Sequence, residues 1–250
     1  MQAIIAFYNS SVGKKVIMAI TGLMMIGFLV GHMAGNLKTF VGYDIAGVHA
    51  LDAYAHHLRQ LGESIFGYGN FLWILRVGLI ATILLHFNAA ICLVARNKKA
   101  RGEGYAKKKN ISATVASTSM AIGGFVILFF VVFHILHFTT GHAHTHGFIE
   151  GQVYQNVFRA FQHGWVVALY SIAMLCIGLH LYHGAWSMFQ TLGIESRGWN
   201  KGLRIFAKSL AVIVTVGFLS VPWSIFAGTM PTPTGPNPTG VTVEVDNGSH

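Results

Sequence analysis

Charged side chains are scarce in this sequence. Only 10% of the 250 residues are charged, whereas 53% are hydrophobic, and the mean hydropathy is +0.55. A soluble globule of this length needs more polar surface than so few charges provide. The composition therefore excludes an ordinary soluble domain and predicts an integral membrane protein.

Cysteine is also nearly absent. The two cysteines, Cys92 and Cys176, fall inside apolar runs and have no CxxC or CxxCH context. We interpret them as small packing residues, which excludes a disulfide framework and covalently attached haem.

Five apolar runs are long enough to cross a bilayer, whose hydrocarbon core of about 30 Å takes about 20 helical residues. We therefore predict an all-α fold, an integral membrane bundle of five transmembrane helices within residues 1–228. The tail, residues 229–250, is rich in Pro, Gly and Thr, and we expect it to be flexible and external. The predicted helices cover residues 16–37, 71–95, 115–138, 165–189 and 205–227.

The distribution of basic residues predicts the orientation, because basic loops stay on the cytoplasmic side. Thirteen of the 17 Lys and Arg residues fall before the first run, between the second and third runs, or between the fourth run and Lys208. The N-terminus is therefore predicted to be cytoplasmic and the C-terminus external, in the cell inner membrane. The net charge of +9 reflects this asymmetry and attraction to anionic lipid, so we expect no nucleic-acid partner.

Two connections between the runs contain clusters of histidine. Residues 38–70 hold apolar positions at helical spacing, together with His49, His56 and His57, and predict a helix along the external surface. The segment GHAHTHG at 141–147 resembles a metal-binding tract. It has no fixed partner residues, so we interpret it as a solvated polar loop, with a metal site as the lesser alternative.

Four predicted helices each carry a histidine deep in the apolar run. At about 1.5 Å of rise per residue, His32 and His134 lie about 24 and 28 Å from the cytoplasmic ends of their helices. His86 and His180 lie about 22 Å from the external ends of helices that run inward. The depths therefore define an external pair, His32 with His134, and a cytoplasmic pair, His86 with His180.

Two neutral imidazoles at one level on facing helices can hold a haem iron, and an ionisable side chain inside a membrane needs a partner. The two matched levels therefore predict two b-type haems rather than four separate core histidines. Arg159 and Arg76 are candidate propionate contacts of the external haem, although both positions also suit snorkelling to the interface. His137 and His183 each follow a predicted ligand by three residues, so either member of each pair could reach iron.

Four segments of these helices carry a family pattern: ITGLMMIGFLVGHMAGNL, LLHFNAAICLVARN, FVILFFVVFHILHF and LHLYHGAWSMFQTLGI. Over about residues 8–225 they resemble the diheme cytochrome b (b558-type) membrane-anchor subunit of the succinate dehydrogenase and fumarate reductase family. The resemblance implies that the iron ligands are His32 and His134 for a distal haem and His86 and His180 for a proximal haem. The interval to Gly193 selects His180, which leaves His183 as a neighbour of the proximal haem.

The resemblance also implies the partners. A flavoprotein and an iron–sulfur protein would meet the cytoplasmic face, with FAD and the iron–sulfur clusters in those subunits only. The anchor would pass electrons to a membrane quinone, menaquinone, through two haem b groups, without catalysing succinate chemistry by itself. The resulting heterotrimer, a respiratory complex II, could assemble into a higher oligomer.

The sequence offers four candidate residues for a quinone site. A quinone needs an apolar slot, donors for its carbonyls and a proton source. The resemblance puts the quinone near the distal haem, where the candidate residues are Asp52, His56, His57 and Glu63. Their spacing indicates no unique geometry.

Two other functions stay open on the sequence. The chain could be the diheme anchor of another peripheral oxidoreductase, such as a hydrogenase or a formate or nitrate reductase. It could also be a metal transporter that uses its histidines without haem. Co-purification with a succinate-oxidising flavoprotein tests the first alternative, and an optical spectrum tests the second.

Overall fold

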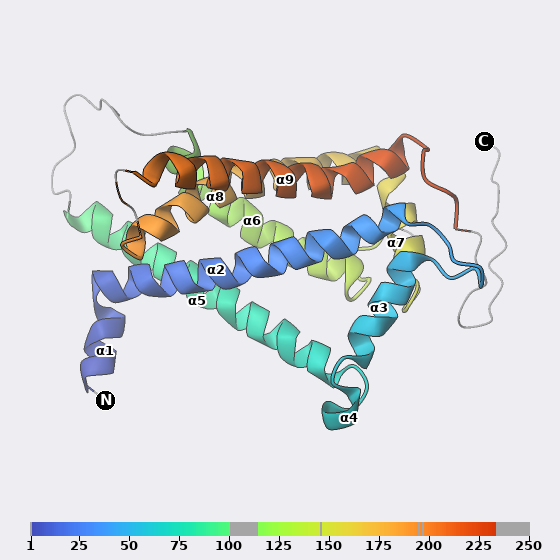
Figure 1. Cartoon of the computed structure of the whole chain (residues 1–250), viewed down its shortest axis with the longest axis horizontal. Helices are drawn as coiled ribbons and strands as arrows, with labels where there is room; N and C mark the ends of the chain where they lie inside the picture. Colours follow the sequence, from blue (N-terminus) through green and yellow to red (C-terminus); the bar gives the residue numbers. More distant parts are fainter. Residues whose placement is uncertain (1, 101–114, 146, 195, 197, 234–250) are drawn as a thin grey trace. The chain divides into compact units, whose positions relative to one another are not determined.

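The computed structural model describes residues 2–100, 115–145, 147–194, 196 and 198–233. Within these ranges the chain is helical, and the only strand-like pairing is an isolated antiparallel bridge between Tyr43 and His49. Figure 1 labels the α-helices. The elements are α1 (Gln2–Asn9), α2 (Ser11–Asn36), the 3-10 helix η1 (Leu37–Phe40), α3 (Ala50–Gln60), α4 (Glu63–Phe66), α5 (Asn70–Ala100), α6 (Val115–Phe138), α7 (Val153–Phe161), α8 (Gly164–Thr191) and α9 (Asn200–Phe226).

Five of the described helical segments are long and apolar enough to cross a membrane. This confirms the prediction of an all-helical, multi-pass membrane protein. Large apolar side chains stay exposed on them, including Ile122 at 74% and Val216 at 59%, as expected for surfaces that face lipid rather than water. The candidate spans are Ser11–Phe40, Asn70–Ala100, Met120–Phe138, Gly164–Thr191 and Asn200–Phe226.

The end of helix α5 differs from the end of the apolar run that predicted it. Helix α5 continues to Ala100, past the predicted end at residue 95, through Arg96, Lys98 and Lys99. Lysine and arginine are good helix formers, so hydropathy marks where the apolar run ends and not where the helix ends. The basic connection after α5 lies largely outside the described residues.

The chain divides into two compact units, and each of the five long helices contributes to both. The first unit comprises Met1–His32, Trp73–Leu128 and Ala173–Val216; the second comprises Met33–Leu72, Phe129–Ile172 and Gly217–His250.

Small residues allow close helix packing in the first unit. Ala185 of α8 and Ala207 of α9 are both fully buried. A side chain at Gly178 of α8 would collide with the Thr215 hydroxyl of α9. Phe87 of α5 meets Phe125 of α6 edge to face, with ring centroids 5.3 Å apart. These contacts are typical of helices that associate in lipid through small residues and tight packing.

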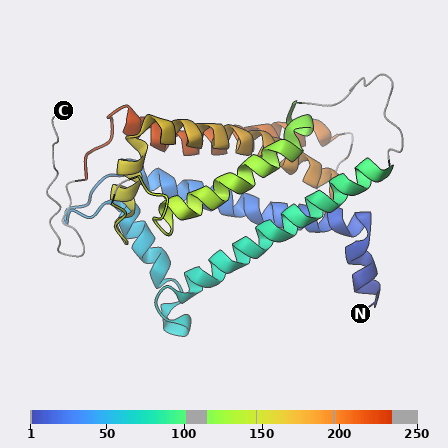
Figure 2. The same cartoon turned by 180° about the vertical axis from the view of Figure 1, so that it is seen from behind.

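In the second unit, the connection between α2 and α5 folds as η1, α3 and α4. Helix α3 confirms the prediction of a helix within residues 38–70, and it packs against α7 (Figures 1 and 2). The sequence pattern did not lead us to predict α7, whose Tyr154, Ala160 and Phe161 are buried. Tyr154 donates from its hydroxyl to the Pro231 carbonyl, 2.5 Å away, so the start of the predicted flexible tail is held. The part of the tail from 234 onward lies outside the described residues.

Candidate functional site

The predicted pair His86 and His180 is brought together in the first unit. His86 lies on α5 and His180 on α8, with ring centroids 6.2 Å apart and ring planes tilted by 58°. Both side chains are half-buried between the helices. Two imidazoles from different helices therefore face one small region of the bundle.

The separation of the two rings can be compared with that of two axial ligands of one metal. Imidazole nitrogens bind transition metals at about 2.0–2.1 Å, so rings on opposite sides of one ion have centroids about 6.3 Å apart. The observed 6.2 Å fits this arrangement. A direct contact between stacked imidazoles would bring the centroids closer.

Thr21 of α2 determines which nitrogen of His86 carries the proton. Its Oγ1 lies 2.6 Å from the Ile17 carbonyl and 3.0 Å from His86 Nδ1. The single hydroxyl hydrogen is used in the shorter bond to Ile17, so Nδ1–H of His86 donates to Thr21. A neutral imidazole has one N–H, which leaves the lone pair on Nε2 for a metal. Such outer hydrogen bonds orient metal-binding histidines.

The surroundings of His180 also fit a bound group. Its Nδ1 is buried and has no hydrogen-bond partner among the described residues. A buried polar atom left without a partner is costly and calls for an explanation such as a bound ion or cofactor.

Glycines lie beside both imidazoles. A Cβ built at Gly22 would lie 3.6 Å from His86 Cε1, and one at Gly124 would lie 3.9 Å from His180 Cε1. Each ring is therefore flanked by bare helix backbone rather than by a side chain. Together with the 6.2 Å separation of the rings and the unpartnered Nδ1 of His180, the residues present fit a haem held by two histidines.

His183 lies one turn further along α8, in different surroundings. Its ring contacts Trp186 edge to face, with centroids 6.5 Å apart. The Arg204 guanidinium covers the same indole at 4.2 Å, and the indole N–H donates to Asn200 at 3.3 Å. His183 thus belongs to an aromatic and cationic cluster at the end of α8.

The second predicted pair is divided between the two units. His32 belongs to the first unit, where it stacks on Phe28 with ring centroids 5.2 Å apart. His134 belongs to the second. Their pairing around a second haem therefore stays a prediction.

Tyr170 of α8 joins His134 to His137 within the second unit. Its hydroxyl oxygen lies 3.2 Å from Nδ1 of His134 and 3.0 Å from Nδ1 of His137. A phenol has one hydrogen to donate, so with both bonds made, one imidazole accepts from Tyr170 and the other donates to it. The two histidines then hold opposite tautomers, and only one of them presents a lone pair at Nε2.

His137 is fully buried, and its Nε2 has no hydrogen-bond partner within the described ranges. Its ring lies 5.2 Å from that of His144, whose Nε2 donates to the Asn156 carbonyl at 3.0 Å. His144 is therefore half-buried and held by Asn156 of the unpredicted helix α7, whereas His142 of the same loop is exposed. No cluster of three metal-binding side chains occurs among the described residues, and His146 lies outside them.

The two candidate propionate contacts have protein partners. Arg159 of α7, in the second unit, donates to the Gly147 carbonyl at 3.3 Å. Arg76 of α5, in the first unit, lies over the Trp73 ring at 4.8 Å. Neither contact involves a predicted iron ligand.

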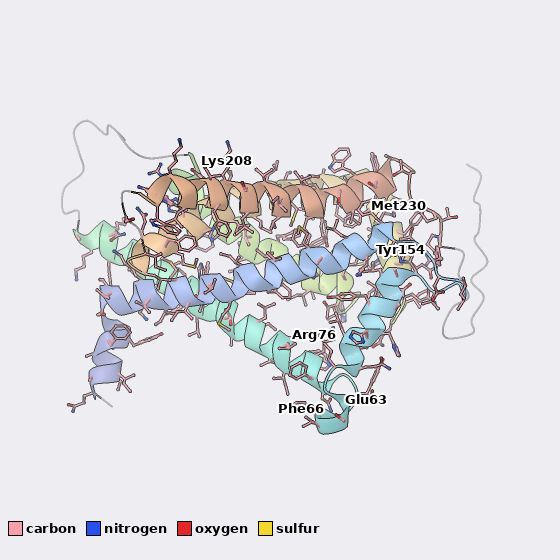
Figure 3. All side chains as sticks on the ribbon, in the orientation of Figure 1. Glu63, Phe66, Arg76, Tyr154, Lys208 and Met230 are labelled. Atoms are coloured by element: carbon pink, nitrogen blue, oxygen red, sulfur yellow. The ribbon has the colours of Figure 1, made fainter. Side chains whose placement is uncertain are left out.

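The four quinone candidates lie in unlike surroundings. Asp52 of α3 accepts the backbone N–H of Tyr154 at 2.9 Å, and burial raises the pKa of its carboxyl. His56 and His57 are exposed on α3. Glu63, which is labelled in Figure 3, is exposed at the start of α4. His57 lines an open groove of about 440 Å³ together with Lys38, Tyr43 and Tyr54. Of the four quinone candidates, His57 alone lines this groove.

His49, to which the sequence assigned no specific role, is also buried in the second unit. It caps α3 by accepting the Leu51 N–H at 3.1 Å, and it stacks on Tyr154 with centroids 3.5 Å apart. Tyr43 closes the cluster edge to face at 4.9 Å. Burial lowers the pKa of His49 to about 4 and raises that of Tyr154 to about 12. The apolar spacing in VYQNVFRAF was the signal that could have revealed α7 and this cluster.

Comparisons of the chain with models of protein families, with curated proteins and with solved structures found no match.

Proposed function

We propose that this protein is a diheme cytochrome b that anchors a succinate:quinone oxidoreductase in the membrane. In this role it passes electrons between an iron–sulfur subunit and a membrane quinone, menaquinone. The observation that carries the proposal is the 6.2 Å separation of the His86 and His180 rings on two membrane-spanning helices. The four segments that resemble the b558-type anchors support the same assignment.

In the proposed site, His86 and His180 hold the proximal haem, and His32 and His134 hold the distal haem. Bound haem supplies reversible one-electron transfer. Thr21 fixes the tautomer of His86 through its hydrogen bond to Nδ1. Gly22 and Gly124 keep the space beside the two rings free of side chains.

The remaining parts of the proposal follow from the sequence pattern. The N-terminus and the basic connections face the cytoplasm, in the cell inner membrane, where a flavoprotein and an iron–sulfur protein bind. Oxidation of succinate takes place in those subunits. We assign no quinone ligand to this chain, because only His57 of the four candidates lines the groove beside α3.

The experiment that tests the proposal is a dithionite-reduced minus oxidised spectrum of the purified full chain, with haem quantified after extraction. We expect a b-type α-band and two haems per chain. A protein without an α-band and without extractable haem contradicts the proposal and favours a haem-free transporter. One haem per chain contradicts the diheme assignment.

Purification with native partners then identifies the enzyme that the anchor serves. We expect a flavoprotein that oxidises succinate to co-purify with the chain. A haem-containing preparation whose partner is instead a hydrogenase or a formate or nitrate reductase would replace the succinate assignment and keep the cytochrome.

A further inference from the structure

Helix α1 (Gln2–Asn9) is an apolar helix, and no residue among those that the structure describes buries any of its side chains. None of its side chains is buried, and Ile4, Ile5 and Phe7 are 73%, 54% and 49% exposed. It contains no charged residue. An exposed apolar surface of this kind marks contact with a membrane or with another protein.

The chain turns sharply between α1 and α2, so that α1 leaves the line of the first span (Figure 1). Ser10 stabilises the turn: its hydroxyl donates to the Phe7 carbonyl at 2.7 Å and accepts the Gly13 N–H at 2.8 Å. Any side chain at Gly13 would collide with the Phe7 carbonyl. The turn therefore depends on glycine at this position.

Arg96 of α5 holds the same turn from a neighbouring helix. Its guanidinium donates to the Asn9 carbonyl at 2.7 Å and to the Ser11 hydroxyl at 3.3 Å. A cation that binds carbonyls at a helix C-terminus stabilises that end. The direction of α1 is thus determined by contacts at both sides of the turn.

Basic side chains surround this end of the first unit. Lys14 folds over the Tyr8 ring at 3.4 Å and is only 4% exposed. Lys15, Lys98 and Lys99 are exposed on the surface of this unit. Basic residues next to a membrane span attract anionic lipid headgroups.

We propose that α1 is an interfacial helix that lies in the bilayer surface at the lysine-rich end of the first two spans. Ile4, Ile5 and Phe7 insert among the acyl chains, and the exposed lysines bind anionic headgroups. A lipid surface explains the helix better than a protein partner does, for two reasons. The candidate span begins at Ser11, two residues after α1 ends. The apolar side chains also leave only a narrow polar side, formed by Gln2 and Asn9.

The test uses the full chain in nanodiscs that contain phosphatidylglycerol, with Cys92 and Cys176 replaced by serine. Phe7→Cys carries an environment-sensitive fluorophore, and Gln2→Cys on the polar side of the same helix is the matched control. We expect nitroxide lipids labelled near the headgroup to quench the label at position 7 several-fold more than the label at position 2. Equal quenching at the two positions overturns the proposal. Protection of position 7 from both lipid and aqueous quenchers also overturns it, because the helix is then covered by protein.

A second variant tests the turn. Arg96→Leu removes both hydrogen bonds to the turn, and we expect it to reduce lipid quenching at position 7 several-fold. Arg204→Leu, which removes the arginine that covers Trp186, is the control and is expected to leave the quenching unchanged. Unchanged quenching in Arg96→Leu would show that the turn does not direct α1 into the lipid. None of these measurements depends on haem.

Discussion

The rings of His86 and His180, from helices α5 and α8, lie with their centroids 6.2 Å apart. This is the spacing of two imidazoles on opposite sides of one metal ion. We therefore expect His86→Ala and His180→Ala each to remove one haem and leave the other. His32→Ala and His134→Ala should each remove the other haem. Extracted haem per chain and the reduced-minus-oxidised spectrum measure both outcomes.

The control for this prediction is His183→Ala, three residues from His180 on the same helix. His183 contacts Trp186 rather than His86, so the variant is expected to retain both haems. Loss of the proximal haem in His183→Ala, with both haems kept in His180→Ala, would show that His183 is the ligand.

Thr21→Val tests the hydrogen bond that fixes His86. The change keeps the size of the side chain and removes the acceptor for the His86 Nδ1–H. Loss of such an outer partner typically weakens metal binding by about 10- to 100-fold. We expect a loss of this order in the affinity of one haem, measured by transfer to apomyoglobin, and a shift in its midpoint potential.

Thr82→Val is the matched control for Thr21. Both threonines are 5% exposed, and Thr82 also donates to a carbonyl of its own helix, that of Gly78 at 2.8 Å. Within the described part of the chain, Thr82 forms no hydrogen bond with an imidazole. If Thr82→Val releases haem as readily as Thr21→Val, the effect of Thr21 comes from packing and not from the tautomer.

The apolar runs were sufficient to predict the spans, because a bilayer requires a minimum length of apolar helix whatever the packing inside it. They were also sufficient to place His86 and His180 at one level, since depth depends only on the rise per residue. Level alone does not establish contact. The contact depends on which faces of α5 and α8 meet, and the packing of the helices decides that.

The role of Thr21 was not predictable from the sequence, because it also depends on how the helices pack. Threonine in an apolar helix usually bonds to its own backbone, and Thr21 does so at Ile17. The second bond, to His86 on another helix, comes from tertiary packing. The cluster around His49 was missed because α7 is too short to be recognised as a span, and its buried face becomes evident only once α3 is packed against it.

Tyr170→Phe tests the link between His134 and His137. Removing the hydroxyl frees Nδ1 of both imidazoles, so their tautomers are no longer opposed. We expect weaker binding of one haem, by about 10- to 100-fold, and an altered low-spin signal of that haem in electron paramagnetic resonance. The experiment is run beside His137→Ala, which should keep both haems if His134 is the ligand.

Tyr182→Phe, on the same helix, serves as the control for Tyr170, since no hydrogen bond of the Tyr182 hydroxyl is described. It should leave haem affinity and the resonance signal unchanged. Identical spectra of Tyr170→Phe and the unmodified protein would mean that the phenol does not select the ligand.

His49 gives the protein a stability that depends on pH. Burial against Tyr154 and Tyr43 lowers its folded pKa to about 4 from an ordinary value of 6.5, so the unfolded chain binds the proton more tightly. The stabilisation by neutral His49 is complete above about pH 6.5 and is lost as the pH falls toward 4, by up to about 3 kcal/mol. Asp52 has the opposite effect on stability. Burial raises the pKa of its carboxyl, so the folded chain binds the proton more tightly than the unfolded chain and acidification favours the folded form.

His49→Asn separates the two effects. Asparagine keeps an acceptor for the Leu51 N–H at the start of α3 but does not titrate. We expect the melting temperature of the variant, measured in detergent from pH 7 to pH 4, to fall less steeply than that of the unmodified protein. His57→Asn, which replaces an exposed imidazole on the same helix, should keep the original slope. Equal slopes in His49→Asn and the unmodified protein would mean that the buried imidazole is not the group that senses acid.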